Sequence, residues 1–502
     1  MRFSFFKREK PVGAFRARRG RLLGLSADDV MRVFFRGNAF AAFVVLGLIV
    51  IFLFREGHEF FGQYRESLVV YRRAGLEFVD VLKKEERGFS ALGRQWDAVR
   101  VTASEKGGEA GELGAIDAFS ENLHDAFAPV RGLIAELGEV AGERKSALVA
   151  GTPIDGTEDP GVFVSRVPQV RMLNGKLRTE LRRLLDSMPA GPEEVKARMA
   201  EFREGTGVFL GNLGEVEAEL AAWDGKRAVG WWEAWTGFVF GREWLTASFW
   251  QDWYGLLPLL CGSVLVSCVA LAIAIPLAVG AGIYVNRFAG ERERAVVKPV
   301  IEFFGAVPSV VLGFFGIAVL GTLLRDVSQW EWLRWVPGFP FAERLNALTA
   351  GCLLGFIAIP IMFTLVEDAL DGVPGALSEA SLALGASRLQ TVLGVVIPAA
   401  FPGIVSAVLL GFGRVVGETM VVLLCAGNRI AIPDFSAGVG VVAQPVHTLT
   451  GIVAQEMGEV VRASIHYRAL FVVGLVLFFL SLLINCVAVR FARRMSRQAA
   501  GR

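Results

Sequence analysis

The chain has 502 residues, of which 53% are hydrophobic and only 20% are charged, and its mean hydropathy is +0.47. This composition excludes an ordinary soluble enzyme and indicates membrane-spanning segments. The net charge of +2 hides an uneven distribution, because the stretch from Arg55 to Glu243 carries 25 Lys and Arg residues against 32 Asp and Glu residues. The sequence therefore predicts apolar spans joined to one acidic, water-soluble insertion.

Six segments are long and apolar enough to cross a bilayer, which takes about 20 mainly apolar residues. The expected spans are Ala39–Phe54, Leu256–Val285, Val300–Leu324, Leu348–Val366, Gly403–Ala426 and Leu470–Val489. The first is short, but Arg36 and Arg55 flank it and can extend their charged groups to the membrane surface. It follows a long basic region and precedes no A-x-A-like cleavage site, so we expect an uncleaved anchor.

The distribution of basic residues predicts the orientation of the chain. Ten Lys and Arg residues lie between Arg2 and Arg36, and five Arg residues lie from Arg490 to the end. Because cytoplasmic segments near membrane spans are enriched in Lys and Arg, both termini should be cytoplasmic, and six spans satisfy this requirement. The basic connection 287–298 is then cytoplasmic as well.

These assignments give an all-α polytopic membrane protein with five parts. They are a basic cytoplasmic arm (1–38), the first span (39–54), a periplasmic insertion (55–245), a transmembrane core (246–490) and a basic cytoplasmic tail (491–502). Within the insertion, apolar residues such as Leu173, Leu177 and Leu181 recur at helical spacing. We therefore expect a large, mainly helical insertion between the first two spans, arranged for example as an antiparallel bundle. A scaffold or lid and a ligand-sensing module are both compatible with it.

The connection 367–402 breaks the charge rule, because it should be cytoplasmic although Arg388 is its only basic residue. Small side chains in it would let a helix fit closely into a groove on another protein, and a following glycine permits a sharp turn. Pro398 and Pro402 then mark the return to the membrane, since a helix can begin at proline without losing a hydrogen bond. The residues of this motif are Glu379, Ala380, Ser381 and Gly385.

The motif resembles the EAA motif of importer-type ABC permeases: EAA, three residues, Gly, nine residues, then I-x-L-P. Ser381, Val395 and Ile397 depart mildly from that pattern. The resemblance implies a type I ABC importer permease fold, in which the loop 367–402 couples the chain to an ATPase. No G-x-x-x-x-G-K-S/T phosphate loop occurs in the sequence, so we expect ATP and Mg²⁺ to be bound by a separate ATPase subunit.

Two opposite charges, Arg414 and Glu418, lie inside the fifth expected span. Their spacing of four residues would put them on one helix face, where they can pair. A charge at the bilayer centre costs at least about 2.5–3.5 kcal/mol, so it is normally paired or lies beside a water-filled pathway. One interpretation is a structural salt bridge between helices. The other is a substrate pathway, because the guanidinium fork matches phosphate oxygens and could exchange the glutamate for a passing oxyanion.

The segment from Gly411 to Gly427 reads GFGRVVGETMVVLLCAG. It resembles the G-x-G-R-A-x-G-E-T-M-A-V segment of PstC-type phosphate ABC permeases, with Val415 in place of the usual alanine. Met420 favours this type over the sister PstA type, which tends to continue with Ala-Pro. The resemblance covers the first span and nearly everything from Phe238 onward, but not roughly 64–230. Similar stretches lie at 240–244, 254–263, 308–316 and 378–386.

This resemblance implies a function and a set of partners. The chain would be half of the pathway of a phosphate importer in the bacterial inner membrane. The expected partners are a PstA-type sister permease, a PstB-type ATPase dimer, a PstS-type periplasmic phosphate-binding protein and the lipid bilayer. We expect no catalytic residue, metal, bound cofactor or nucleic acid on this chain. The residues expected along the substrate pathway are Arg414, Glu418, Thr419 and Ser309.

Other functions are compatible with parts of the sequence. The EAA motif also fits a permease for another oxyanion or a phosphonate. A helical insertion between two spans is found in membrane sensors too, although only a short tail follows Arg490. A membrane-embedded enzyme is disfavoured, because the four histidines are scattered and no nucleophile constellation is visible. The acidic insertion should repel phosphate dianions over a screening distance of about 8 Å, so we expect it to contact a partner protein or regulate access.

Overall fold

The computed structural model describes residues 27–105, 110–151, 160–189, 195–246, 248 and 250–499. These residues are mostly helical, which confirms the expected all-α class. The described residues form one small antiparallel sheet, in which β1 (Trp244–Leu245) pairs with β2 (Trp253–Tyr254). The basic arm expected at 1–38 begins outside the described residues, and the last three residues of the basic tail also lie outside them.

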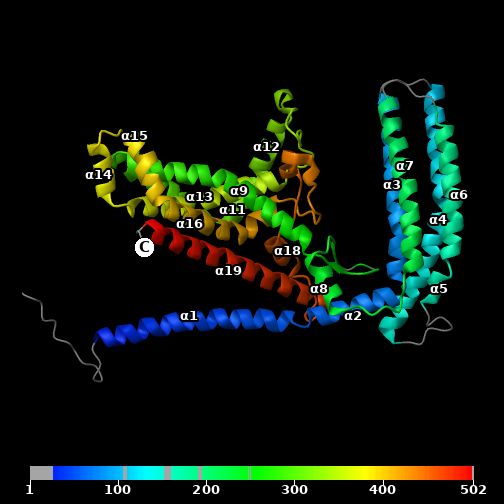
Figure 1. Cartoon of the computed structure of the whole chain (residues 1–502), viewed down its shortest axis with the longest axis horizontal. Coiled ribbons are helices and arrows are strands. Elements are labelled where there is room, and N and C mark those ends of the chain that lie inside the picture. The colour runs from blue at the N-terminus through cyan, green and yellow to red at the C-terminus, as the bar shows by residue number, and fades with distance from the viewer. Residues whose placement is uncertain are drawn as a thin grey trace, which may run out of the picture.

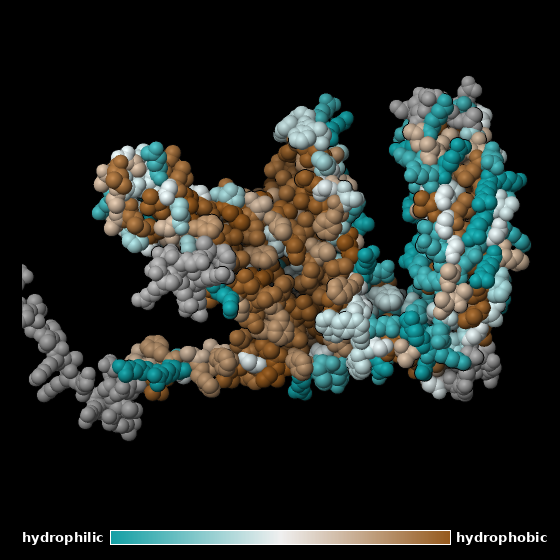
Figure 2. All heavy atoms as spheres, in the orientation of Figure 1, coloured by the Kyte–Doolittle hydropathy of each residue, from teal (hydrophilic) through white to brown (hydrophobic). Residues whose placement is uncertain are grey.

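Six helical segments are long and apolar enough to cross a membrane, as expected. Five of them contain the helices α1 (Ala27–Gly57), α9 (Leu257–Ile283), α13 (Ala347–Asp371), α16 (Ile397–Val416) and α19 (Ile465–Ala499). The sixth, Ser309–Ser328, consists of α11 (Ser309–Phe315), η3 (Gly316–Leu320) and α12 (Gly321–Ser328). Figure 2 shows a continuous hydrophobic surface over these segments, whereas the insertion is largely hydrophilic.

Shorter elements connect and flank the spans. They are α2 (Phe60–Arg73), α8 (Trp231–Val239), η2 (Tyr284–Phe288), α10 (Glu291–Phe304), η4 (Glu331–Leu333), α14 (Gly375–Ala383), α15 (Arg388–Thr391), η5 (Val392–Val396), α17 (Met420–Cys425), η6 (Phe435–Ala443) and α18 (Leu449–Glu456). In Figure 1, α14 and α15 lie at the same end of the spans as the start of α1 and the end of α19. The insertion lies at the opposite end.

The third span begins later than expected. The sequence predicts a helix from Val300 to Leu324, but α10 ends at Phe304 and α11 begins only at Ser309. Pro308 explains the break, because proline has no N–H to donate and disfavours helical backbone in the residue before it. The apolar end of α10 therefore belongs to the connection before the span.

Small residues allow the central spans α9, α13 and α16 to pack closely. Gly351 of α13 has its α-carbon against Val269 of α9, and Gly282 of α9 lies against Val366 of α13. On α16, Gly411 lies against Met362 of α13. A Cβ at any of these three glycines would come within 3 Å of a neighbouring side chain. Close approach through small residues is the usual packing mode of membrane helices, and it places α13 between α9 and α16.

The insertion is a bundle of four long helices, which confirms its expected helical character. They are α3 (Leu76–Glu105), α4 (Ala110–Ala150), α6 (Val167–Asp186) and α7 (Lys196–Ala222), with the short α5 (Gly161–Val164) between α4 and α6. Stacked and edge-on aromatic rings fill the core, including Phe89 against Phe127 and Trp96 against Phe119 and Phe202. The bundle axis runs across the direction of the spans (Figure 1).

The base of the bundle is fastened to the spans by charged and aromatic contacts. Arg72, which is buried at the end of α2, pairs with Glu77 of α3 at 2.8 Å and also with Glu233 of α8. Trp250, in the β1–β2 loop, lies under Lys83 of α3, whose Nζ is 3.5 Å from the indole ring centre. The carbonyl of Trp250 accepts a hydrogen bond from Lys145 of α4. These contacts attach the bundle to α2, α8 and the β1–β2 loop, which connect it to the spans.

A buried carboxyl group in the bundle makes its stability depend on pH. Glu85 of α3 is 2% exposed and accepts a hydrogen bond from Asn174 of α6 at 2.9 Å, while its second oxygen has no hydrogen-bond partner among the described residues. Burial is the main cause that raises the pKa of Glu85 from 4.5 to about 7, and the negative charge of Glu217 raises it further. The hydrogen bond from Asn174 and the positive charge of Arg178 lower the pKa, but they do not offset the effect of burial.

We expect the Glu85 contribution to the stability of the bundle to fall as pH rises from 4.5 through about 7. Between pH 4.5 and about 7 the folded bundle keeps a proton on Glu85 that the unfolded chain has released. The contribution of Glu85 to stability is therefore fully present below pH 4.5 and is lost, by up to ~3 kcal/mol, as pH rises through about 7. Hydrogen–deuterium exchange, corrected for intrinsic rates, should show weaker protection of α3 and α6 at pH 8 than at pH 5. Glu85→Gln should remove this difference, and Glu86→Gln should leave it intact.

Candidate functional site

Arg414 and Glu418 lie at a break between two helices. The sequence predicts one helix through Ala426, but α16 ends at Val416 and α17 begins at Met420. Gly417 is the C-cap residue of α16, and glycine is the weakest helix former after proline. The prediction that one continuous helix carries both charges is therefore wrong, although the pair still forms across the break.

The ion pair leaves most of the arginine free. Arg414 Nη2 lies 3.6 Å from Glu418 Oε2, which is longer than the 2.7–2.9 Å typical of a charge-assisted hydrogen bond. The Arg414 side chain is 55% exposed, whereas that of Glu418 is 8% exposed. A guanidinium in this position can present its fork to an oxyanion while it stays close to the carboxylate that balances its charge.

Hydrogen bonds hold the backbone of the break in place. Glu418 lies between the two helices, and its carbonyl accepts a hydrogen bond from the Thr450 hydroxyl at 2.9 Å. Thr450 lies in α18, whose first turn is also tied to α9 because Leu449 N donates to Ser263 Oγ at 2.9 Å. Glu418 is thus anchored through its main chain by elements far away in the sequence.

The two other expected pathway residues begin helices that lie next to each other. Thr419 directly precedes α17 and is half-buried; Ser309 is the first residue of α11 and is also half-buried. The helices α11 and α17 are in contact, because Cys425 Sγ lies 3.3 Å from the Gly313 carbonyl. The structure therefore brings the element that carries Ser309 beside the element that follows Glu418 and Thr419.

The expected coupling loop is a helix, a tight turn and a second short helix. Glu379, Ala380 and Ser381 lie in α14, and Ser381 Oγ is 3.0 Å from Thr391 Oγ1 of α15. Gly385 has φ of +88°, a backbone conformation that other residues rarely adopt. Two boundaries of the loop differ from expectation. Helix α13 continues to Asp371, so Glu367 is still helical. Helix α16 has already begun at Pro398, which lies in its first turn, and Pro402 lies inside it.

Sequence reasoning missed the most exposed apolar residue of this loop. Leu384, directly before Gly385, is 90% exposed at the tip of the turn. Other leucines of the loop with large exposed fractions are Leu377, Leu382, Leu389 and Leu393. An apolar patch of this kind commonly marks a protein interface. The sequence signal for this patch is a run of leucines around Gly385. The run indicates an exposed patch only when the loop is known to lie outside the membrane.

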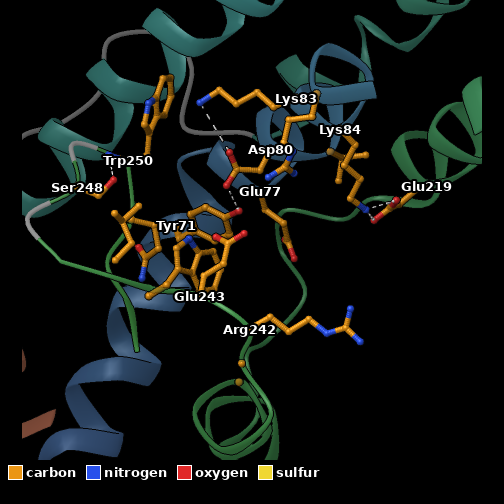
Figure 3. Close-up of a pocket in the computed structure, with 17 residues that line it drawn as sticks. Tyr71, Glu77, Asp80, Lys83, Lys84, Glu219, Arg242, Glu243, Ser248 and Trp250 are labelled. Atoms are coloured by element: carbon orange, nitrogen blue, oxygen red, sulfur yellow. Dashed lines mark hydrogen bonds and ion pairs between the residues drawn. The ribbon is translucent and has the colours of Figure 1, made fainter. Parts of the chain in front are cut away.

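A separate cavity of about 570 Å³ lies at the base of the insertion (Figure 3), and its lining residues come from 71–87, 219 and 237–253. Its charged lining is largely engaged in pairs: Lys84 with Glu219 at 2.7 Å and Lys83 with Asp80 at 3.8 Å. Asp80 also accepts a hydrogen bond from the Tyr71 hydroxyl at 2.6 Å. The cavity belongs to the junction between α3, α7 and the β1–β2 loop, and we assign it no role in the pathway.

Comparison with known proteins identifies the class of protein. Residues 274–497 match the family of binding-protein-dependent transport system inner membrane components. A probable ABC transporter permease, YqgH of Bacillus subtilis (strain 168), is 33% identical over 250 residues, which are 48% of this chain and 74% of the relative. The chain therefore belongs to the ABC transporter permease family and is a component of a transporter.

Several relatives carry a more particular name. The phosphate transport system permease protein PstC of Pasteurella multocida (strain Pm70) is 27% identical, with 53% of this chain and 84% of the relative covered. A probable PstC of Methanocaldococcus jannaschii is 30% identical, with 49% and 77% covered. Among solved structures, the inward-facing MetNI methionine ABC transporter matches at 22% identity and a TM-score of 0.34, covering 48% of this chain and 94% of that chain.

Proposed function

We propose that this chain is the transmembrane permease subunit of an ATP-driven, binding-protein-dependent phosphate importer. The observation that carries the proposal is the half-exposed guanidinium of Arg414, held 3.6 Å from the buried carboxylate of Glu418 at a helix break. An oxyanion that enters this site would gain bidentate contacts with arginine, while the net charge of the pathway stays balanced. The PstC names of several relatives support phosphate as the anion.

The proposal includes the partners and the orientation. A PstA-type sister permease would complete the pathway, a PstB-type ATPase dimer would bind ATP and Mg²⁺ and hydrolyse ATP, and a PstS-type protein would deliver phosphate. The start of α1, the end of α19 and the α14–α15 turn lie at one end of the spans, and the bundle lies at the other (Figure 1). This arrangement supports cytoplasmic termini and a periplasmic insertion in a bacterial inner membrane.

The test is uptake of labelled phosphate by vesicles that contain all four components. Uptake should require ATP inside the cytoplasmic compartment and the loaded binding protein outside. Excess unlabelled phosphate should compete, whereas sulfate or a phosphonate should not. If a phosphonate or another oxyanion is transported and phosphate is not, the cargo assignment is wrong although the class stands. Absence of any ATP-dependent uptake would contradict the importer itself.

The insertion should not serve as the phosphate-binding module. Its excess of acidic residues opposes the capture of a dianion, and the lining of its junction cavity is largely paired. We propose that it contacts a partner protein or regulates access. Isothermal titration of phosphate into the 60–230 segment should show no binding at micromolar concentrations, and tight binding would overturn this assignment.

Gly385 offers a sharp test of the coupling turn. Gly385→Ala should weaken binding of the ATPase subunit about tenfold, because an alanine at positive φ costs about 1–2 kcal/mol. Gly375→Ala in the same loop is a matched control, since an added Cβ meets open space at both positions and only Gly385 has a positive φ. The measurement is the affinity of the purified ATPase for the permease pair in nanodiscs. Equal affinities of the two variants would show that the turn conformation is not needed for docking.

A further inference from the structure

Glu367 is a charged residue buried at the end of a membrane span. It lies near the last turn of α13, and its side chain is 1% exposed. Two cations of α10 meet its two oxygens: Arg294 Nη2 lies 2.6 Å from Oε1, and Lys298 Nζ lies 2.8 Å from Oε2. Because a buried carboxylate without partners is strongly destabilising, the position of α13 and the position of α10 depend on each other here.

Neighbouring contacts join the same two segments. Asn286 Nδ2 donates a hydrogen bond to Asp371 Oδ1 at 2.7 Å, and Arg294 also lies 3.6 Å from Asp371 Oδ2. Arg287 donates to the carbonyl of Leu370. We call the ion-pair group Arg294, Lys298, Glu367 and Asp371 the brace. It ties the end of α13 to the connection between α9 and α11.

Ion pairs and partial apolar packing together hold α10 beside α13. The structure describes α10 in full, and none of its residues is fully buried. Its apolar residues Val296, Val300 and Phe303 are each more than half exposed. Val297 and Ile301 of α10 pack against the core that α13 helps to form, and the brace adds the charged contacts between α10 and the end of α13.

The brace lies between the two candidate sites. Beyond Glu367 the chain passes through Gly372 into α14, which carries the coupling motif. Beyond Lys298 it passes through Pro308 into α11, which begins with Ser309 and contacts α17 beside the Arg414 region. The brace therefore links the chain segment that leads to α14 with the segment that leads to α11.

We propose that Glu367 is a positioning residue, which transmits movement of the coupling loop to the span that carries Ser309. This inference rests on the proposed function, because it assumes that an ATPase moves α14 during transport. The brace would couple ATP hydrolysis to phosphate transport without contacting ATP or phosphate. Loss of the brace should therefore uncouple the two processes rather than stop both.

The main experiment compares phosphate uptake with ATP hydrolysis in proteoliposomes that contain the complete complex. Glu367→Gln should keep hydrolysis within about twofold of wild type and lower uptake at least tenfold, so that more ATP is hydrolysed per phosphate. Glu367→Asp should restore part of the uptake. Asp368→Asn is the matched control, because Asp368 is exposed on the same turn, and it should behave as wild type.

Exchanging the two charges of the ion pair distinguishes loss of the pair from misfolding of the variant. Glu367→Arg alone should abolish uptake, and adding Arg294→Glu should recover at least part of it, because the pair is rebuilt with opposite polarity. The proposal is overturned if Glu367→Gln keeps the wild-type ratio of hydrolysis to uptake. It is also overturned if uptake and hydrolysis fall in parallel and neither Glu367→Asp nor the exchange restores them.

A distance measurement separates failure of the inference from failure of the proposed function. Spin labels are placed at Ala295 of α10 and Ala376 of α14, both exposed, in a chain whose five cysteines are replaced by alanine. The wild-type background should give one narrow distance distribution, and Glu367→Gln should broaden or shift it. If the wild-type complex takes up no phosphate, the proposed function fails while this measurement still decides the brace. An unchanged distribution would overturn the positioning role.

Discussion

Arg414→Ala should lower phosphate uptake at least about 100-fold while the chain still inserts and assembles with its partners. The alanine removes the only part of the candidate pathway pair that can bind an oxyanion, and it leaves the 8% exposed carboxylate of Glu418 without its cation. Losing charge-assisted contacts of this kind costs ~3 kcal/mol, which corresponds to about a hundredfold change in rate. Uptake of labelled phosphate by vesicles with the complete complex is the measurement.

Two further variants make the Arg414 result specific. Arg414→Lys keeps the charge but loses the planar fork, so uptake should remain low if bidentate contacts matter. Arg429→Ala changes an exposed arginine outside the helices and should leave uptake near wild type. Normal uptake by Arg414→Ala would reduce the pair to a structural salt bridge. Poor assembly of that variant, seen as loss of the sister permease on co-purification, would point to the same structural role.

Leu384→Asp should abolish ATP-dependent uptake by preventing the ATPase from docking. Leu384 is 90% exposed at the tip of the turn, and burying a leucine in a partner's groove is worth about 1.5–3 kcal/mol. Leu384→Ala should therefore weaken ATPase binding about tenfold, and a charged aspartate should weaken it much further because it must also be desolvated. Binding of the ATPase to the permease pair in nanodiscs measures both effects directly.

The control for Leu384 is an equally drastic change on another exposed apolar residue. Val208→Asp, on α7 of the insertion, replaces a side chain that is 60% exposed at the opposite end of the spans. It should leave ATPase binding unchanged. If Leu384→Asp binds the ATPase as well as Val208→Asp does, the leucine tip does not take part in the interface.

The spans and the helical insertion could be predicted because their signals are local. A run of about 20 apolar residues suffices for a span, and apolar residues at helical spacing suffice for an amphipathic helix. The breaks inside the apolar runs are harder to predict. Hydropathy continues across both Pro308 and Gly417, so only the backbone chemistry of single residues marks where each helix ends.

In the candidate sites, too, features with a local sequence signal could be predicted and features that depend on packing could not. The spacing of the coupling motif and of Arg414 and Glu418 could be read directly from the sequence. Burial of Glu367 could not, because its partners lie on α10, about 70 positions earlier, and a carboxylate is normally assigned to a loop. Likewise, the Thr450 contact that anchors the Glu418 backbone depends on how α18 packs, which no local pattern encodes.

The shape of the insertion has a mechanical consequence. The 41 residues of α4 extend about 60 Å at 1.5 Å per residue, and the bundle is attached near one end through α2, α8 and the β1–β2 loop. A rod of that length is a lever: a tilt of about 5° at the base displaces the far tip by about 5 Å. Small rotations of α2 and α8 are therefore amplified at the tip of the bundle, where a distance probe would detect them most easily.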